Sequence, residues 1–235
     1  MKKIGIVGGT AWVSTIEYYA AMCELGAATG VQPEFSIESI DNARAQSYVG
    51  KPDDEASWAR FDAYHGDALR RLERAGSGVA LLGANTPHHR FAAITAGVGI
   101  PVVHIVDAVA AVCASLGIAR LLLLGTALTM SSPVIRARYA EHGVDAIVPP
   151  PGEHPAIVAL IEELQHGAGA SAAEAIASTA RPYLTNGNTA VGLACTELPL
   201  AFPEERRSKY FDRDGIRYLN TLAIHAQAAF DRASA

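Results

Sequence analysis

The chain has 235 residues, of which half are hydrophobic and 18% are charged, and its formal net charge is -5 at pH 7. This composition excludes a disordered chain and leaves room for one large or two small globular domains. The charges form no basic stripe that would bind phosphates, so we expect no nucleic-acid partner.

The first ten residues, MKKIGIVGGT, resemble a signal peptide only superficially. Their apolar stretch is too short, and glycines follow where an apolar helix would continue. No segment of the sequence approaches the roughly 20 apolar residues of a membrane span. We therefore expect a soluble cytoplasmic protein with no membrane partner.

The predicted elements alternate between short apolar strands and longer helical patterns. Strands that are apolar throughout and separated by helices are typical of parallel sheets covered on both faces. The sequence therefore predicts an α/β fold. The predicted strands span 3–9, 34–39, 78–84, 100–106, 119–126, 144–150 and 188–195, and helical patterns span 14–30, 57–76, 155–167 and 215–233.

Two pairs of segments in the chain are similar to each other. VALLGANTPHH (79–89) matches AVGLACTELPL (190–200), and IGIVGGTAWVST (4–15) matches LLLLGTALTMSS (121–132). In the second pair each strand leads through a glycine turn into a helix start. The expected caps are Ser14 or Thr15 for the first helix and Ser131 or Ser132 for the second, with Pro133 in the first turn of the second helix.

This repeat predicts two pseudo-symmetric Rossmann-like subdomains, each a mainly parallel sheet flanked by helices. We expect residues 1–105 plus 208–235 to form the first subdomain and residues 106–207 to form the second. Ligands of such sheets bind beyond the carboxyl ends of the strands. The active site is therefore expected in a cleft between the two subdomains.

The chain contains three cysteines, Cys23, Cys113 and Cys195, with no CxxC pair. An odd count without paired spacing predicts neither a disulfide framework nor a zinc site. Cys23 and Cys113 lie in helical patterns and are interpreted as packing residues. Cys195 follows a predicted strand and precedes a predicted helix start at 196–200, so it is the candidate reactive thiol.

Four motifs carry a resemblance to a known family. They read GGTAWVSTIEYY, GANTPHH, LLGTALTM and ACTELPL, and they run from Gly8 to Pro199. In this order and spacing they resemble the aspartate/glutamate racemase family, within the Asp/Glu/hydantoin racemase superfamily. The resemblance implies a cofactor-independent isomerase that exchanges the α-proton of an acidic amino acid between two residues, one in each half. It also implies a homodimer as one assembly, because relatives are often dimers.

In relatives both proton-exchanging residues are usually cysteines, and in a subset the first is threonine. Cys195 matches the second of these positions, whereas Ala84 occupies the first. Removing an α-proton needs a strong, desolvated base and stabilisation of the enediolate that forms. A thiolate is such a base once its pKa falls from about 8.5, which a helix start and polar donors can bring about.

The resemblance assigns roles to further residues. Glu197 would orient or deprotonate Cys195 or, alternatively, only cap the following helix, and His88 would make a structural hydrogen bond or relay a proton. Two turns that contain threonines would form walls of the cleft. Asn85, Thr86 and Thr196 would contact the substrate carboxylate, and Gly9, Thr10, Thr126 and Thr129 would belong to the two turns.

Other ligands and contacts are less supported by the sequence. The adjacent side chains of His88 and His89 cannot point the same way, so we expect no metal site. The glycines form neither GxGxxG nor a Walker pattern, which argues against a nucleotide. A carboxylate substrate needs a cation, and the candidates are Arg44, Lys51, Arg90 and Arg136.

The sequence leaves four interpretations of function open. The first is an amino-acid racemase acting on an aspartate-like or glutamate-like carboxylate through Cys195. The second is a one-cysteine lyase that decarboxylates a small diacid, for which one acid suffices. The third is a binding homologue with impaired catalysis. The fourth is an engineered chain in which Ala84 replaces a cysteine.

Overall fold

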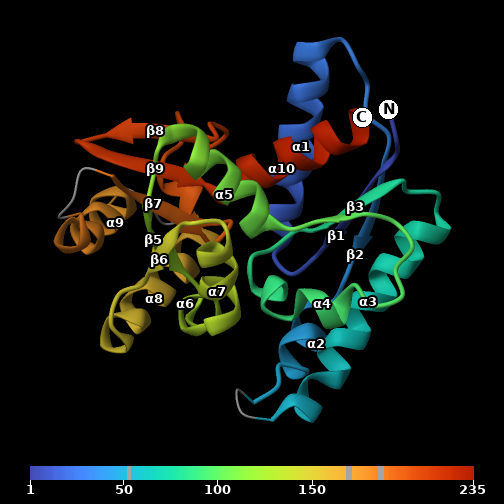
Figure 1. Ribbon diagram of the computed structural model, residues 1–235, viewed down its shortest axis with the longest axis horizontal. Helices are drawn as coiled ribbons and strands as arrows, with labels where there is room; N and C mark the ends of the chain where they lie inside the picture. Colours follow the sequence, from blue (N-terminus) through green and yellow to red (C-terminus); the bar gives the residue numbers. More distant parts are fainter. Residues whose placement is uncertain (52–53, 168–170, 185–187) are drawn as a thin grey trace. The chain divides into compact units, whose positions relative to one another are not determined.

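The computed structural model describes residues 1–51, 54–167, 171–184 and 188–235. The chain forms two α/β units, which confirms the predicted fold class (Figure 1). The first unit comprises Met1–His104 and Ala226–Ala235, and the second comprises Ile105–His225. In the described part of the chain, no helix is long and apolar enough to cross a membrane.

The first unit is built on a parallel sheet with the strand order β2-β1-β3-β4. All four strands were predicted, and each is shorter than the apolar run that contains it. The strands are β1 (Ile4–Gly8), β2 (Phe35–Ser39), β3 (Val79–Leu82) and β4 (Val102–Val103). The helices are α1 (Trp12–Thr29), α2 (Asn42–Ser47), η1 (Glu55–Trp58), α3 (Ala59–Arg74), η2 (Thr86–Arg90) and α4 (Phe91–Ile94).

Helices α1 and α3 cover opposite faces of this sheet (Figure 1). A Cβ atom added at Gly8 would meet Thr15 of α1, whereas one added at Gly5 would meet Leu72 of α3. Gly5 and Gly8 lie an odd number of positions apart on β1, so they face opposite sides. Strands covered on both faces can be apolar throughout, which explains the apolar runs.

The second unit is built on a sheet with the order β6-β5-β7-β9-β8, in which β8 pairs antiparallel with β9 and the other pairs are parallel. The strands are β5 (Arg120–Gly125), β6 (Asp145–Ile147), β7 (Thr189–Ala194), β8 (Tyr210–Arg213) and β9 (Ile216–Asn220). The helices are α5 (Ile105–Leu116), α6 (Ala127–Ser131), α7 (Pro133–Glu141), η3 (Pro151–Glu153), α8 (His154–Gln165), α9 (Ala172–Ala180), η4 (Arg181–Tyr183) and η5 (Leu198–Ala201). The last helix, α10 (Thr221–Ser234), begins in this unit and belongs to the first unit from Ala226 onward.

Alternate residues of β5 pack into two different hydrophobic cores in this unit. Leu122 and Leu124 belong to a cluster that includes Ile157 of α8. Leu121 and Leu123 belong to a second cluster, which includes residues of α5 and α7. The sheet is therefore covered on both faces, as in the first unit.

The two sheets repeat the same strand order, because β2-β1-β3-β4 corresponds to β6-β5-β7-β9. In this correspondence Gly8 and Gly125 end matched strands, β1 and β5. Ala84 comes just after β3 and Cys195 comes just after β7, so these two residues also occupy matched places in their own units. The internal similarity of the sequence therefore reflects a structural repeat.

The structure differs from the predicted boundaries at residues 208–225, which belong to the second unit. Strand β9 pairs with β7, although a helix was predicted to begin at 215. Arg213 pairs with Ile216, which leaves Asp214 and Gly215 as the two-residue loop of a hairpin. Both loop residues have positive φ, which is the conformation for which Asp-Gly is favoured in such loops. This Asp-Gly pair was the signal of the hairpin in the sequence.

The predicted helix caps are correct in one case and wrong in the other. The hydroxyl of Ser132 accepts a hydrogen bond from the backbone N–H of Ile135 at 3.1 Å, and Pro133 lies in the first turn of α7. Helix α1, however, begins at Trp12, before the residues expected to cap it. Thr15 Oγ1 instead accepts from Gly9 N at 2.9 Å, so this side chain holds the turn between β1 and α1.

Candidate active site

Cys195 lies directly after β7, where the strand delivers its side chain into a buried position with 7% exposure. Its Sγ donates a hydrogen bond to Glu197 Oε2 at 2.8 Å. Since the two residues are only two positions apart, the local bend of the chain after the strand brings them together. The structure thus joins the candidate thiol to the carboxylate that the sequence proposed as its partner.

The carboxylate of Glu197 is itself held in place from two directions. Thr196 Oγ1 donates to Glu197 Oε2 at 3.2 Å, and Gln165 Nε2 donates to Glu197 Oε1 at 3.2 Å. Glu197 is only 2% exposed, so these donors replace contacts with water. The sequence did not predict this role of Gln165, because the residue lies in the last turn of α8 and belongs to none of the four motifs.

Burial raises the pKa of the Cys195 thiol well above its ordinary value, and the adjacent Glu197 carboxylate raises this pKa further. The backbone N–H groups of Thr196 and Glu197 act in the opposite direction but do not compensate. The expected helix start at 196–200 is a short 3-10 turn, η5, that begins at Leu198. The thiol is therefore protonated at neutral pH in this arrangement, contrary to the lowered pKa expected from the sequence.

The loop after β3 places Ala84 and Asn85 in buried positions at the start of η2. The carbonyl of Asn85 accepts a hydrogen bond from His88 N at 3.1 Å, which closes the first turn of η2. Thr86 is the first residue of that turn. Ala84, Asn85, Thr86 and His88 thus form one compact segment of the first unit, whereas Cys195, Thr196 and Glu197 form another in the second unit.

His88 is fully buried in a small aromatic cluster. Its ring stacks on Phe91 with centroids 5.5 Å apart and meets His104 edge-on at 4.6 Å. These ring contacts pack the imidazole of His88 against its aromatic neighbours.

The two glycine–threonine turns are held by different local constraints. Gly9 has φ of +87°, and a Cβ atom there would collide with the backbone of Ile40, so the turn requires glycine. Thr10 follows Gly9 in the same turn, before α1. In the second unit Thr126 caps α6 by accepting from Thr129 N at 3.2 Å, and the two hydroxyls lie 2.9 Å apart.

The candidate cations differ in how far they are engaged. Arg90 is bound to the carboxylates of Glu55 and Asp62. The guanidinium of Arg44 lies over the ring of Tyr64, 5.9 Å from its centroid. Lys51 and Arg136 are exposed.

The two remaining cysteines lie in helices, Cys113 in α5 and Cys23 in α1. Cys113 is fully buried in the core of the second unit, and burial raises its pKa to about 12, which supports its interpretation as a packing residue. Cys23 is half-buried on α1. Across the described ranges, no group of three or more His, Cys, Asp or Glu residues could hold a metal ion.

The chain thus combines two repeated α/β units with a buried thiol–carboxylate pair at a strand exit. The family model described as Asp/Glu/Hydantoin racemase matches residues 7–229. The chain therefore belongs to the Asp/Glu/hydantoin racemase family, as the four sequence motifs suggested.

Solved structures of racemases and a racemase homologue are similar over almost the whole chain. An aspartate racemase homologue from Pyrococcus horikoshii OT3 shares 30% identity with a TM-score of 0.82, and 100% of each chain is covered. The aspartate racemase of Picrophilus torridus shares 20% identity over 99% of this chain and 94% of its own, with a TM-score of 0.75. Glutamate racemase from Thermus thermophilus, in complex with β-chloro-D-alanine, shares 21% identity over 99% and 80% of the chains, with a TM-score of 0.63. The last two show the same fold.

Proposed function

We propose that this protein is a cofactor-independent racemase-type isomerase of small acidic amino acids, with Cys195 as an acid and base at Cα. The observation that carries this proposal is the buried hydrogen bond from Cys195 to Glu197, 2.8 Å long, at a strand exit of a racemase-family chain. The family and the aspartate racemase homologue at 30% identity support an aspartate-like or glutamate-like substrate.

Glu197 solves the problem that a protonated thiol is not a base. Cys195 passes its proton to Glu197 Oε2, and the resulting thiolate removes the α-proton of the bound amino acid. The electron pair of the broken C–H bond moves into the substrate carboxylate, which becomes an enediolate. Thr196 and Gln165 keep the Glu197 carboxylate aimed at the sulfur during this exchange.

Racemisation also needs a proton donor for the opposite face of Cα. Ala84 cannot donate, so we assign this step to water, Thr86 or His88. The new C–H bond forms with inverted configuration, the donor recovers its proton from solvent, and Glu197 gives up its proton in turn. Asn85 and Thr86 are assigned to the substrate carboxylate, which an amide and a hydroxyl can hold by hydrogen bonds.

The decisive experiment is α-proton exchange in deuterium oxide, followed by NMR, with both enantiomers of aspartate, glutamate and other amino acids. We expect the wild-type protein to incorporate deuterium at Cα and Cys195→Ala to lower the rate by about 10²–10⁴-fold. Ala84→Cys should accelerate interconversion of the enantiomers, whereas the equally small Ala84→Ser should not. Absence of exchange with every amino acid at high enzyme concentration would refute the proposal.

A second candidate is a lyase that decarboxylates a small diacid. Two observations favour it: the thiol of Cys195 is held in its protonated form, and alanine stands at the matched position of the first unit. Protonating a carbanion from one face needs one acid only. Release of CO₂ from substituted malonates, lost in Cys195→Ala, would establish this activity, and its absence across a broad panel would exclude it.

A further inference from the structure

Arg90 stands at the end of η2, the turn that also contains Thr86 and His88. Its guanidinium bridges two carboxylates of the first unit that come from different elements. Nε and Nη2 donate to Asp62 of α3 at 3.1 and 2.7 Å, and Nη1 and Nη2 donate to Glu55 of η1 at 2.7 and 2.5 Å. Both carboxylates are thus engaged through two oxygens each.

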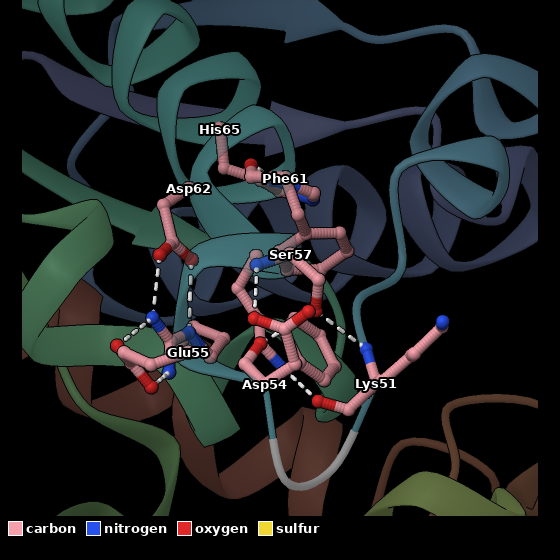
Figure 2. A network of polar contacts seen from close by, with 9 residues as sticks. Lys51, Asp54, Glu55, Ser57, Phe61, Asp62 and His65 are labelled. Atoms are coloured by element: carbon pink, nitrogen blue, oxygen red, sulfur yellow. Dashed lines mark hydrogen bonds and ion pairs between the residues drawn. The ribbon is translucent and has the colours of Figure 1, made fainter.

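The two carboxylates differ in their exposure to water. The side chain of Asp62 is 13% exposed and that of Arg90 is 12% exposed, whereas that of Glu55 is 81% exposed. Figure 2 shows dashed contacts from the carboxylates of Glu55 and Asp62, and both sets of contacts go to the guanidinium of Arg90. The ion pair between Arg90 and Asp62 is therefore shielded from solvent, whereas the ion pair between Arg90 and Glu55 faces the solvent.

The segment that contributes Glu55 is itself well braced. Asp54 caps η1 by accepting from Ser57 N at 3.2 Å, and Ser57 Oγ accepts from Lys51 N at 2.7 Å (Figure 2). Trp58 is 2% exposed and donates to Lys51 O at 2.9 Å. Glu55 is therefore presented by a fixed turn.

Trp58 also contacts η2 directly. Its ring lies 5.2 Å from that of His89, and the guanidinium of Arg90 lies 5.4 Å from its centroid. Arg90 thus joins η2 to η1 by charge, and Trp58 joins the same two turns by packing. A guanidinium has the planar fork needed to bind two carboxylates at once, which the ammonium of lysine lacks.

We propose that Arg90 is a positioning residue for substrate binding: its bridge to Asp62 and Glu55 fixes η2, and through η2 the carboxylate-binding groups of Asn85 and Thr86. This rests on the proposed function, which assigns Asn85 and Thr86 to the substrate carboxylate. Contacts to that carboxylate form in the bound substrate and strengthen as the carboxylate becomes an enediolate. Loosening them therefore raises KM and also lowers kcat.

The test uses Arg90→Lys, Asp62→Asn and Glu55→Gln, with Arg70→Lys as the matched control. Arg70 pairs with Asp67 on the same helix, α3, but this pair is more exposed and does not involve η2. We expect Arg90→Lys to raise KM for aspartate about tenfold and to lower kcat by more than about threefold. Asp62→Asn should change KM more than Glu55→Gln does, because it removes the charge of the partner that is shielded from solvent. Arg70→Lys should leave KM unchanged.

Two further measurements report on η2 without catalysis. Amide hydrogen exchange of residues 84–91 should be faster in Arg90→Lys than in the wild type and unchanged in Arg70→Lys. In a Trp12→Phe background, which leaves Trp58 as the single tryptophan, the emission should shift to longer wavelength in Arg90→Lys.

The outcomes separate this inference from the proposed function. Unchanged amide exchange in Arg90→Lys, equal effects of Arg70→Lys, or an unchanged KM despite faster exchange would each overturn the positioning role. If the wild-type protein exchanges no α-proton with any amino acid, the proposed function fails. Amide exchange and Trp58 emission then still decide whether Arg90 fixes η2.

Discussion

At the scale of single residues, Cys195 and Glu197 show how burial and a neighbouring charge set the state of a reactive group. Burial disfavours the thiolate, and so does the carboxylate that accepts the hydrogen bond of the thiol. Gln165 and Thr196 both donate to that carboxylate and hold it beside the sulfur. The sulfur and the carboxylate oxygen are therefore placed for the transfer of one proton between them.

Glu197→Gln should make Cys195 more reactive toward iodoacetamide at pH 7.5. The substitution keeps the shape of the side chain but removes the negative charge that raises the pKa of the thiol, so this pKa falls and the thiolate fraction rises. The measurement is the pH profile of alkylation of Cys195, followed by mass spectrometry. Its midpoint should shift to lower pH.

The control for this substitution is Glu163→Gln, which removes an exposed carboxylate of α8. It should leave the alkylation profile of Cys195 unchanged. A Glu197→Gln midpoint that stays in place or moves to higher pH would show that the carboxylate does not govern the thiol.

At the scale of elements, the β8–β9 hairpin decides which unit the segment after η5 joins. Its loop residues, Asp214 and Gly215, have φ of 51° and 76°. In this loop the chain reverses so that β9 pairs with β7 on one side and with β8 on the other. The following helix, α10, then starts at Thr221, whose hydroxyl donates to Leu193 O of β7 at 2.8 Å.

Gly215→Ala should lower the free energy of unfolding by about 1 kcal/mol. A Cβ atom at this position has no neighbour within 4 Å, so the cost arises from the positive φ alone. Urea denaturation measures the effect. Gly152→Ala is the matched control, because that position also has open space around it but no positive φ, and it should be nearly neutral. Equal stabilities of the two variants would contradict the role assigned to the turn.

At the scale of the whole molecule, stability should depend on pH through His65 of α3. This histidine is 1% exposed, and its Nδ1 lies 2.9 Å from the carbonyl oxygen of Phe61. Its Nε2 has no hydrogen-bond partner within the described part of the chain. Burial lowers the pKa of His65, against smaller opposing effects of the Phe61 carbonyl and the Asp62 carboxylate.

The sign of the pH effect follows from proton binding. Below an unfolded-state pKa of about 6.5 the unfolded chain binds a proton that the folded chain rejects, so acid favours unfolding. We expect the wild-type protein to lose stability as the pH falls from about 6.5 toward the lowered pKa of His65. His65→Phe should lose less, as measured by urea midpoints at pH 7.5 and 5.0.

His166→Phe is the control for this prediction. His166 makes the same contact with the carbonyl four residues earlier, at 2.7 Å from Glu162 O, but it is exposed to water. His166→Phe should lose as much stability between pH 7.5 and 5.0 as the wild type does. A His65→Phe protein with the same loss between pH 7.5 and 5.0 as the wild type would contradict the assignment.

Local patterns in the sequence predicted much of the fold and part of the candidate site. Alternation of apolar runs and helical spacing is set by neighbours along the chain, so it identified β1 to β7 and the repeat of two units. Cys195 and Glu197 are close in sequence, so their pairing could also be expected. The cap at Ser132 was predicted correctly for the same reason.

Only the tertiary structure decided the contacts that join distant segments. Gln165 reaches Glu197 across 32 positions, and Arg90 reaches Glu55 across 35, with no periodic pattern to announce either contact. The pairing of β9 with β7 likewise placed 208–225 in the second unit. The protonation of Cys195 depends on its burial, which the packing around the end of β7 sets. The sequence by itself determined which groups are present and their local order, whereas folding determined their solvation and their partners.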